Sequence, residues 1–307
     1  MVLFIIGLGL GDEKDITVRG LEAVKSCDKI FLEAYTSILR VDKERLESFY
    51  DKSISIADRH KVESEAEQII EPAKDQNVAL LVVGDPVCAT THTDIIIRAQ
   101  EIGVQVELIH NASAMGAVGC CGLQVCLIDT FFFIHTLIIT SIFTCFLQTF
   151  KLYNFGRTVS IPFFEHNWRP TSFYEKIQYN KDGGMHTLCL LDIKVKEPDF
   201  EAMARGKTVY LPPRYMTVNT AAEQLLEAEQ EHQKGVCTSD CLAVGLARLG
   251  QPDQCILAGT LQELTTQHFG EPLHSLIICG DVHELEFEML RKFMVPSTKY
   301  RFSEKES

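Results

Sequence analysis

Apolar and polar residues alternate along the first part of the chain in segments that predict short strands separated by helices. The apolar runs that we interpret as strands are residues 2–6, 29–32, 54–56, 79–83 and 104–109. The segments that we interpret as helices are residues 17–26, 43–50, 65–71, 95–101 and 114–124. Candidate capping residues are Asp15 or Thr17, Ser64 with Glu67, Thr93 with Asp94, and Ser113. This alternation predicts a parallel α/β sheet.

Three of the predicted strands end in turns rich in small residues, at positions 7–11, 84–91 and 111–114. Residues 79–83 show no polar alternation, which is typical of a strand covered on both faces. The carboxyl ends of parallel strands lie at one edge of a sheet, where open α/β folds bind ligands. We therefore expect the three turns to meet there and to offer backbone N–H groups to a polar ligand.

The glycines at positions 7, 9 and 11 also invite a dinucleotide-binding interpretation. Their spacing is one residue short of the usual G-x-G-x-x-G, although Glu33 closes the next strand at a fitting distance. The predicted helix does not open on the glycines, and the acidic residues at 12–15 would repel a pyrophosphate. These features argue against a dinucleotide site, and the glycine pattern taken alone is a weak signal.

The second half of the chain predicts another α/β unit. Residues 158–164 are interpreted as the last strand of the first domain, with Pro162 indicating an edge position or a bulge. The further strands expected are residues 187–193, 242–249, 254–260 and 274–279, and the helices are residues 172–179, 219–231 and 284–293. We predict domains at 1–168 and 185–296, followed by a polar tail at 297–307.

Composition narrows the classes of function. A net charge of −13 argues against non-specific nucleic-acid binding, which needs clustered Lys and Arg. Eleven cysteines occur without a C-x-x-C pair, so we expect free thiols and neither a zinc site nor a disulfide framework. The N-terminus lacks a basic segment before its apolar run, so we interpret it as a strand and not a signal peptide, and expect a cytoplasmic protein.

Several motifs resemble the diphthine synthase family, and in particular its eukaryotic branch, the diphthine methyl ester synthases. In the first half these are GLGLGDEKDIT at the start, EAYTS at 33–37, VVGDP at 82–86, ATTHTD at 89–94 and HNAS at 110–113. In the second half they are MHTLCLLDIKVKE at 185–197, PPRYM at 212–216, GLARLG at 245–250 and GEPLHSLIICG at 270–280. The resemblance covers nearly the whole chain except residues 125–151.

The resemblance implies two α/β domains of the tetrapyrrole methylase type, with S-adenosyl-L-methionine in the cleft between them, and a homodimer. It implies methylation of a modified histidine on translation elongation factor 2, at the amino and carboxyl groups of an added 3-amino-3-carboxypropyl arm. Carried over by motif, the cofactor-binding residues are Leu10, Asp85, Cys88, Ser113, Ala114, Leu191, Leu249 and His274. The chain departs from the family at Cys88 and Gly116, where the family usually has Gly and Asn.

Methyl transfer from a sulfonium needs alignment more than acid–base catalysis, because the methyl group is already activated. The accepting amine must nevertheless be neutral, and Asp85 or His274 could take its proton directly or through water. The alternatives are a turn-forming role for Asp85 and a structural role for His274, and for His274 we favour the structural role. No metal is required, and no cluster of metal ligands is visible in the sequence.

Residues 125–151 form an apolar block without a counterpart in the family. Residues 131–148 are near the lower length limit for a spanning helix. A membrane anchor would interrupt a compact domain, and an exposed surface insertion would invite aggregation. We favour a retained intron, because every Val codon begins with GT, a Lys codon can end with AG, and removal restores GLQLYNFG. If translated, the block is expected as a surface excursion that leaves the sheet intact, with membrane association only if it spans.

Two other functions compete with the methyltransferase. One is an inactive isoform, membrane-associated or not, that binds cofactor or partner without turnover because of the block and Cys88. The other is a related methyltransferase acting on a corrin or on RNA. The acidic charge disfavours RNA, and the motifs of the second half favour the diphthine group.

The intron hypothesis predicts that most transcripts join the codons of Gln124 and Leu152. Sequencing the transcript across this junction tests it, and a ubiquitous spliced message that contains the block would refute it. At the protein level, chains with and without residues 125–151 are compared in a methyl-transfer assay. The inactive-isoform hypothesis requires that the folded full chain binds the cofactor without turnover.

Overall fold

The computed structural model describes residues 1–35, 39, 41–88, 90, 92–123, 154–165, 167–197, 203, 205–206, 209–296, 298 and 300. The predictions for the block at 125–151 and for most of the tail lie outside the described residues. The chain divides into two compact units. The first contains Met1–Ala117, Ile193–Arg214 and Leu249–Asp253, and the second contains Val118–Asp192, Tyr215–Arg248 and Gln254–Ser307.

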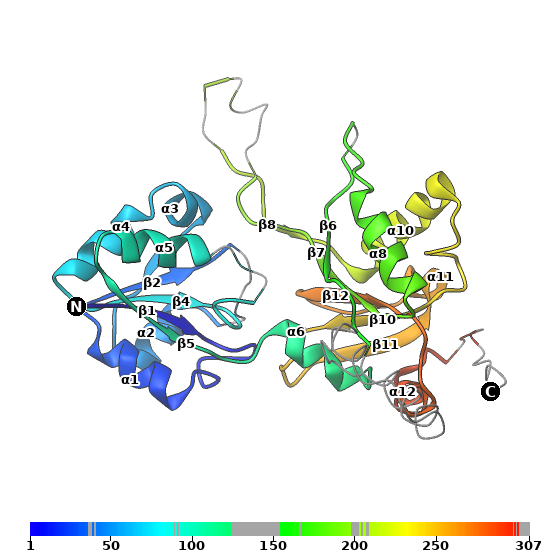
Figure 1. Ribbon diagram of the computed structural model, residues 1–307, viewed down its shortest axis with the longest axis horizontal. Helices are drawn as coiled ribbons and strands as arrows, with labels where there is room; N and C mark the ends of the chain where they lie inside the picture. Colours follow the sequence, from blue (N-terminus) through cyan, green and yellow to red (C-terminus); the bar gives the residue numbers. More distant parts are fainter. Residues whose placement is uncertain are drawn as a thin grey trace, which may run out of the picture. The chain divides into compact units, whose positions relative to one another are not determined.

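The first unit is built on a five-stranded sheet with the order β3-β2-β4-β1-β5 (Figure 1). Its strands are β1 (Val2–Gly7), β2 (Lys29–Glu33), β3 (Ser55–Ala57), β4 (Val78–Val82) and β5 (Gln105–Ile109). Every pairing is parallel, with Ile5 opposite both Leu80 and Leu108. The predicted parallel α/β sheet is confirmed, and its carboxyl edge holds the ends of β1, β4 and β5.

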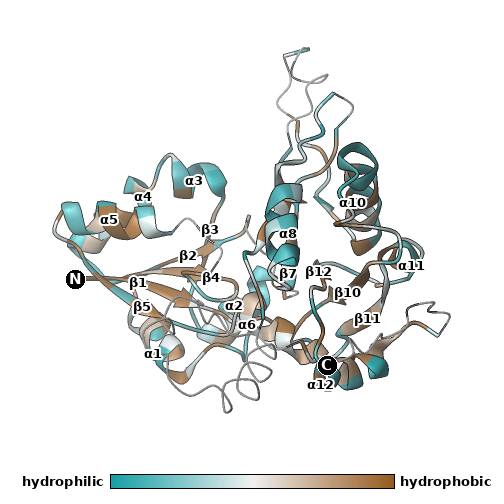
Figure 2. Ribbon diagram, turned by 45° about the vertical axis from the view of Figure 1, so that its right-hand side comes forward, coloured by the Kyte–Doolittle hydropathy of each residue, from teal (hydrophilic) through white to brown (hydrophobic). Residues whose placement is uncertain are grey.

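Helices cover both faces of this sheet (Figures 1 and 2). They are α1 (Val18–Ser26), α2 (Lys43–Tyr50), α3 (Arg59–Glu63), α4 (Glu67–Ile70) with the 3-10 turn η1 (Glu71–Lys74), and α5 (Thr93–Glu101). The short helix α6 (Ala114–Ala117) follows β5 and does not cover the sheet. In β4, Leu80 joins a buried cluster with residues of α3, α4 and α5, whereas Leu81 joins one with residues of α1 and α2. Burial on both sides explains why this strand shows no polar alternation.

The helix starts differ in part from the prediction. Thr17 caps α1 by accepting a hydrogen bond from the Gly20 N–H at 3.0 Å, as expected. The proposed Ser64 cap is wrong: Asp58 caps α3 through the Lys61 N–H, and α4 starts at Glu67 without a side-chain cap. Helix α5 also starts without a side-chain cap, so the predicted cap at 93–94 is not formed.

The predicted helix at 114–124 is much shorter than expected. Helix α6 ends at Ala117 and passes into the 3-10 turn η2 (Val118–Cys121). Gly116, Gly119 and Gly122 lie in this stretch, and Gly122 has φ +100°. Glycine disfavours helix by about 1 kcal/mol per residue relative to Ala, so three within seven positions are sufficient to end the helix early.

The second unit contains a five-stranded sheet with the order β11-β10-β12-β7-β6. Its strands are β6 (Val159–Ile161), β7 (Thr187–Leu191), β10 (Leu242–Ala247), β11 (Cys255–Thr260) and β12 (His274–Ile278). The pairs β10–β11, β10–β12 and β12–β7 are antiparallel, and β6–β7 is parallel. The assignment of residues 158–164 to the first domain is wrong, because β6 pairs with β7 and Val159 and Ile161 are buried in the second core.

Helices α8 (Ser172–Asp182), α10 (Val218–His232), α11 (Leu261–Leu264) and α12 (Glu284–Leu290) complete the second unit, together with η5 (Arg291–Phe293). The short pair β8 (Ile193–Lys194) and β9 (Arg214–Tyr215) forms a separate ribbon. Helix α10 packs Val218, Ala221 and Leu225 into the core at helical spacing. Within the described residues, no helix has both the length and the apolar character to cross a membrane.

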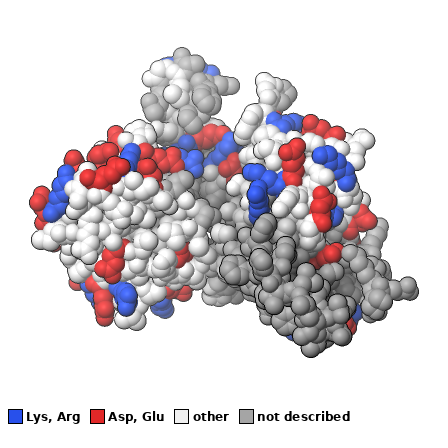
Figure 3. Space-filling model, viewed as in Figure 1, with Lys and Arg blue, Asp and Glu red and all other residues white. Residues whose placement is uncertain are grey.

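Acidic side chains gather over helices α3 to α5 on the face shown in Figure 3, with Lys and Arg interspersed. Glu63, Glu65, Glu67 and Asp94 are exposed there. Several of them pair with neighbouring bases, as Asp94 does with Arg98 at 3.3 Å. This helical face is therefore a mixed, predominantly acidic surface.

A half-buried carboxylate on α10 anchors the loop that follows this helix. Glu229 accepts hydrogen bonds from the N–H groups of Gly235, Val236 and Cys237 at 2.6–2.8 Å, and from the Tyr174 hydroxyl at 2.7 Å. Burial opposes the charged form, but these bonds outweigh it and lower the pKa of Glu229. The charge therefore stabilises the fold above the unfolded-state pKa of about 4.3, and this contribution is lost as the pH falls through the lower folded-state pKa.

We expect Glu229→Gln to lower the free energy of unfolding by about 2 kcal/mol at neutral pH, because hydrogen bonds to a charged acceptor are lost. The difference from the unmodified chain should shrink as the pH falls below about 4, where the carboxylate itself becomes protonated. Urea unfolding over a pH series measures both quantities. The control is Glu231→Gln, an exposed position on the same helix, which should change stability by less than about 0.5 kcal/mol. A Glu229→Gln difference independent of pH would contradict the assignment.

Candidate functional site

The turns after β1 and β4 are joined directly through their backbones. Gly84 N–H donates to Gly9 O at 2.8 Å, and Gly9 N–H donates to Gly84 O at 3.3 Å. Both glycines have positive φ, +77° for Gly9 and +82° for Gly84, which residues with a Cβ rarely adopt. The two chain reversals are therefore held as one antiparallel bridge at the carboxyl edge of the sheet.

Asn111 ties the third turn, after β5, to the first. Its Nδ2 donates to Gly7 O and to Asp15 O, both at 2.9 Å, while its Oδ1 accepts from the Ala112 N–H at 2.7 Å. A Cβ on Gly7 would lie 2.6 Å from Gly84 O and 2.8 Å from Asn111 Cβ. Only glycine permits this approach, so the predicted meeting of the three turns is confirmed.

Asp15 occupies the N–H groups of the glycine turn. Its Oδ2 accepts from Gly11 N at 2.7 Å and from Leu10 N at 3.3 Å. Of the preceding N–H groups, Leu8 N–H donates to Val82 O in β4, and Gly9 N–H donates to Gly84 O in the turn after β4. The expectation that this turn offers free N–H groups to a ligand is therefore wrong, because the chain already uses them internally.

Asp85, directly after that bridge, is a buried and fully engaged carboxylate. Its Oδ1 accepts from Val87 N at 2.9 Å, and its Oδ2 accepts from His110 Nδ1 at 2.9 Å and Asn111 N at 3.1 Å. Burial disfavours the charge, but the hydrogen bonds outweigh it and the pKa of Asp85 is lowered. Such a carboxylate is a weak base, so its geometry fits a structural and orienting role better than proton removal.

The loop that follows Asp85 is stabilised by hydrogen bonds between its own residues. Cys88 N–H donates to Asp85 O at 3.3 Å, and the Cys88 thiol is partly buried and free. Pro86 O accepts from Thr90 Oγ1 at 2.8 Å and from His92 Nδ1 at 3.1 Å. His92 is fully buried, and within the described part of the chain its Nε2 has no hydrogen-bond partner. This loop places Asp85 and Cys88 next to each other.

Ser113 and Ala114 lie beside the same bridge, where α6 begins. A Cβ built on Gly84 would meet only Ala112 O at 3.9 Å and Ser113 Cα at 4.0 Å, which are ordinary contact distances. Ser113 and Ala114 are both partly exposed. The rim around Gly84 is therefore made of small groups.

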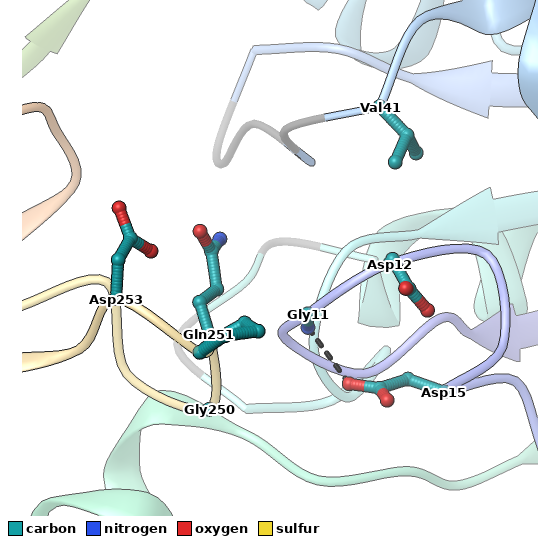
Figure 4. A pocket seen from close by; sticks show the side chains of 8 residues that line it. Gly11, Asp12, Asp15, Val41, Gly250, Gln251 and Asp253 are labelled. Atoms are coloured by element: carbon teal, nitrogen blue, oxygen red, sulfur yellow. Dashed lines mark hydrogen bonds between the residues drawn. The ribbon is translucent and has the colours of Figure 1, made fainter.

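A cavity of about 540 Å³ adjoins the glycine turn (Figure 4). It is lined by Gly11, Asp12, Asp15, Val41, Gly250, Gln251, Pro252 and Asp253. In Figure 4, Gln251 and Asp253 come from one loop, which lies beside the loop of Gly11 and Asp12. A Cβ on Gly250 would lie 3.0 Å from Leu10 Cβ, so Leu10 packs against this loop, next to Leu249. Three carboxylates line the cavity, which favours a positively charged ligand group. Asp85, Cys88, Ser113 and Ala114 do not line it.

The two remaining predicted residues, Leu191 and His274, belong to the second unit. Leu191 ends β7 and is buried in the core of that unit. His274 Nδ1 accepts from Val218 N at 3.3 Å, and Nε2 lies 3.1 Å from both Gly270 O and Glu271 O. Burial lowers the pKa of His274, so the ring is neutral, and both nitrogens are used by the backbone. This geometry fits the structural role that we favour from the sequence.

Sequence reasoning missed the roles of Asn111, Asp15 and His110. His110 and Asn111 belong to the motif HNAS at 110–113, but the motif does not indicate which residues their side chains contact. The sequence suggests Asp15 as a helix cap or as one of several acidic residues, whereas its side chain binds the glycine turn. Among the described residues, no cluster of His, Cys, Asp and Glu has the geometry of a metal site.

Comparisons with known proteins agree on one family. Residues 2–129 match the Tetrapyrrole (Corrin/Porphyrin) Methylases. The chain is 51% identical over 303 residues to the diphthine methyl ester synthase of Mus musculus, covering 97% of this chain and 98% of the relative. It is 52% identical over 295 residues to the enzyme of the same name from Schizosaccharomyces pombe, covering 96% and 95%. A crystal structure of diphthine synthase matches with a TM-score of 0.75 at 32% identity, covering 96% of each chain.

We expect Gly7→Ala to destabilise the protein by about 1–3 kcal/mol, because the added methyl group would collide with the backbone at Gly84 and force the turns apart. Denaturant unfolding measures this loss. Gly116→Ala is the matched control: a Cβ there meets nothing within 4 Å, and Ala favours the helix by about 1 kcal/mol. Equal stability of the two variants would show that the three turns are not packed as described.

Proposed function

We propose the methyl donor and the methyl acceptor of this chain from its family. The chain belongs to the diphthine methyl ester synthases within the tetrapyrrole methylases, and it is a methyltransferase of diphthamide biosynthesis. The donor is S-adenosyl-L-methionine. The acceptor is the 3-amino-3-carboxypropyl arm on a histidine of translation elongation factor 2, methylated at its amino and carboxyl groups. The observation that carries this proposal is that the chain is about half identical to its relatives over nearly their whole length. The turns at the sheet edge, which are small and hydrogen-bonded to one another, agree with it.

The residues of the first unit that hold the donor are Leu10, Asp85, Cys88, Ser113, Ala114 and Leu249, and those of the second unit are Leu191 and His274. When bound, the donor supplies a methyl group activated by a positively charged sulfur. The small side chains around Gly84 allow close approach, and the carboxylates next to Leu10 favour a ligand with cationic groups. These observations support the assignment in the first unit.

The residues of this chain align the donor and prevent it from binding in other orientations. Asn111, Asp15 and the Gly9–Gly84 bridge hold three loops by hydrogen bonds that do not depend on a ligand. Such preorganisation suits an in-line displacement, since a misplacement of about 1 Å can cost about 100-fold in rate. Cys88 introduces a thiol into this rim where the family usually has Gly, and its N–H is bonded to Asp85 O.

The remaining proposals follow from the same function. A protein acceptor on the translation machinery requires that the enzyme work in the cytoplasm, and the resemblance implies a homodimer. An inactive isoform is disfavoured, because relatives that share about half of the residues are named as synthases in mouse and fission yeast. Size-exclusion chromatography with light scattering tests the dimer.

We expect the full chain to transfer labelled methyl groups from S-adenosyl-L-methionine to elongation factor 2 that carries the unmethylated arm. Asp15→Ala should lower kcat/KM by about 100-fold, because the glycine turn loses the carboxylate that holds it. The control is Asp94→Ala, an exposed position that pairs with Arg98 on α5, which should keep normal activity. A folded chain that binds the donor but labels no elongation factor would refute the proposed acceptor.

A further inference from the structure

His110 and Asp85 form a pair with a defined orientation. His110 follows the last residue of β5, and its Nδ1 lies 2.9 Å from Asp85 Oδ2. The Asp85 side chain is 6% exposed, whereas the His110 side chain is 64% exposed. A buried acid therefore binds one nitrogen of an imidazole whose remaining surface is open to solvent. The same Asp85 oxygen also accepts from Asn111 N, which places the pair on the rim of the three turns.

The pairing determines which nitrogen of His110 carries the proton. The lowered pKa of Asp85 keeps the carboxylate ionised at neutral pH, so it can only accept hydrogen bonds. His110 Nδ1 must then be the donor, and in the neutral ring Nε2 is the unprotonated acceptor. In this tautomer the lone pair of Nε2 is the one that can accept a proton.

The two residues first considered for proton removal are both engaged elsewhere. Both oxygens of Asp85 are occupied by Val87, His110 and Asn111. Both nitrogens of His274 contact the backbone of the second unit. His110 differs from both, because it combines an exposed acceptor nitrogen with a buried anionic partner.

We propose that His110 is the general base of amine methylation, with Asp85 as its positioning residue; this rests on the proposed function. The neutral amine attacks the donor methyl carbon, a C–N bond forms, the C–S bond breaks, and the electron pair leaves on sulfur. The product nitrogen is then a methylammonium, whose proton passes to His110 Nε2 and regenerates a neutral amine for another transfer. His110, which is exposed, releases the proton to water.

This role distinguishes the two sites of methylation on the arm. A carboxylate that attacks a sulfonium methyl group forms an ester without releasing a proton, so it needs no base. A quaternary ammonium cannot accept a further methyl group. An elongation factor whose arm already carries a trimethylated nitrogen therefore reports ester formation alone, whereas the unmethylated arm reports amine methylation.

The test compares His110→Asn with the unmodified full chain on both substrates, with mass spectrometry of the modified peptide as the readout. The asparagine amide can still donate to Asp85, as Nδ1 does, but it offers no basic nitrogen in place of Nε2. Amine methylation should fall by about 100-fold, and ester formation should change by less than about 3-fold. The control is His60→Asn, an exposed histidine facing Glu65 on the surface, which should leave both reactions unchanged.

Each other result overturns the proposal. Unchanged amine methylation would show that no base acts at His110. An equal fall in both reactions, with normal donor binding and thermal stability, would show that His110 orients the donor or acceptor. If the unmodified chain forms neither product, the proposed function itself fails, and this outcome is distinct from a selective defect of His110→Asn.

Discussion

The hydrogen bonds of two side chains, Asp85 and Asn111, hold together three chain reversals that are far apart in the sequence. Asn111 reaches carbonyl oxygens of Gly7 and Asp15, and Asp85 reaches N–H groups on its own turn and on the turn after β5. A buried charge is tolerated there because it is fully bonded. Without these bonds the backbone polar groups at the sheet edge would be unsatisfied, and the rim would have no single shape.

The sheet behind this rim explains why the site lies where it does. All pairings in the first sheet are parallel, so β1, β4 and β5 deliver their carboxyl ends to the same edge. Helices bury both faces, as the two clusters on either side of β4 show, and leave the edge as the place where loops can vary.

The bonding within the rim also restricts how it can bind. The N–H groups of Leu10 and Gly11 are taken by Asp15, so an anion has no free donors in the glycine turn. Carboxylates prevail in the neighbouring cavity. A ligand with positive groups is therefore favoured by charge at this cavity.

The succession of the five strands in the first unit, the burial of β4 on both faces and the convergence of the three turns were determined by the sequence alone. Local periodicity and glycine positions carry that information, because they act through neighbouring residues. Only the tertiary structure decided that β6 belongs to the second sheet, that Asp15 binds a turn and not a helix end, and that His110 meets Asp85. The pairing of β6 with β7 and the contact of His110 with Asp85, 25 residues away, depend on partners distant in sequence, which no local pattern specifies. Asp15 bonds Gly11 only four residues away, but this bond depends on how the glycine turn folds.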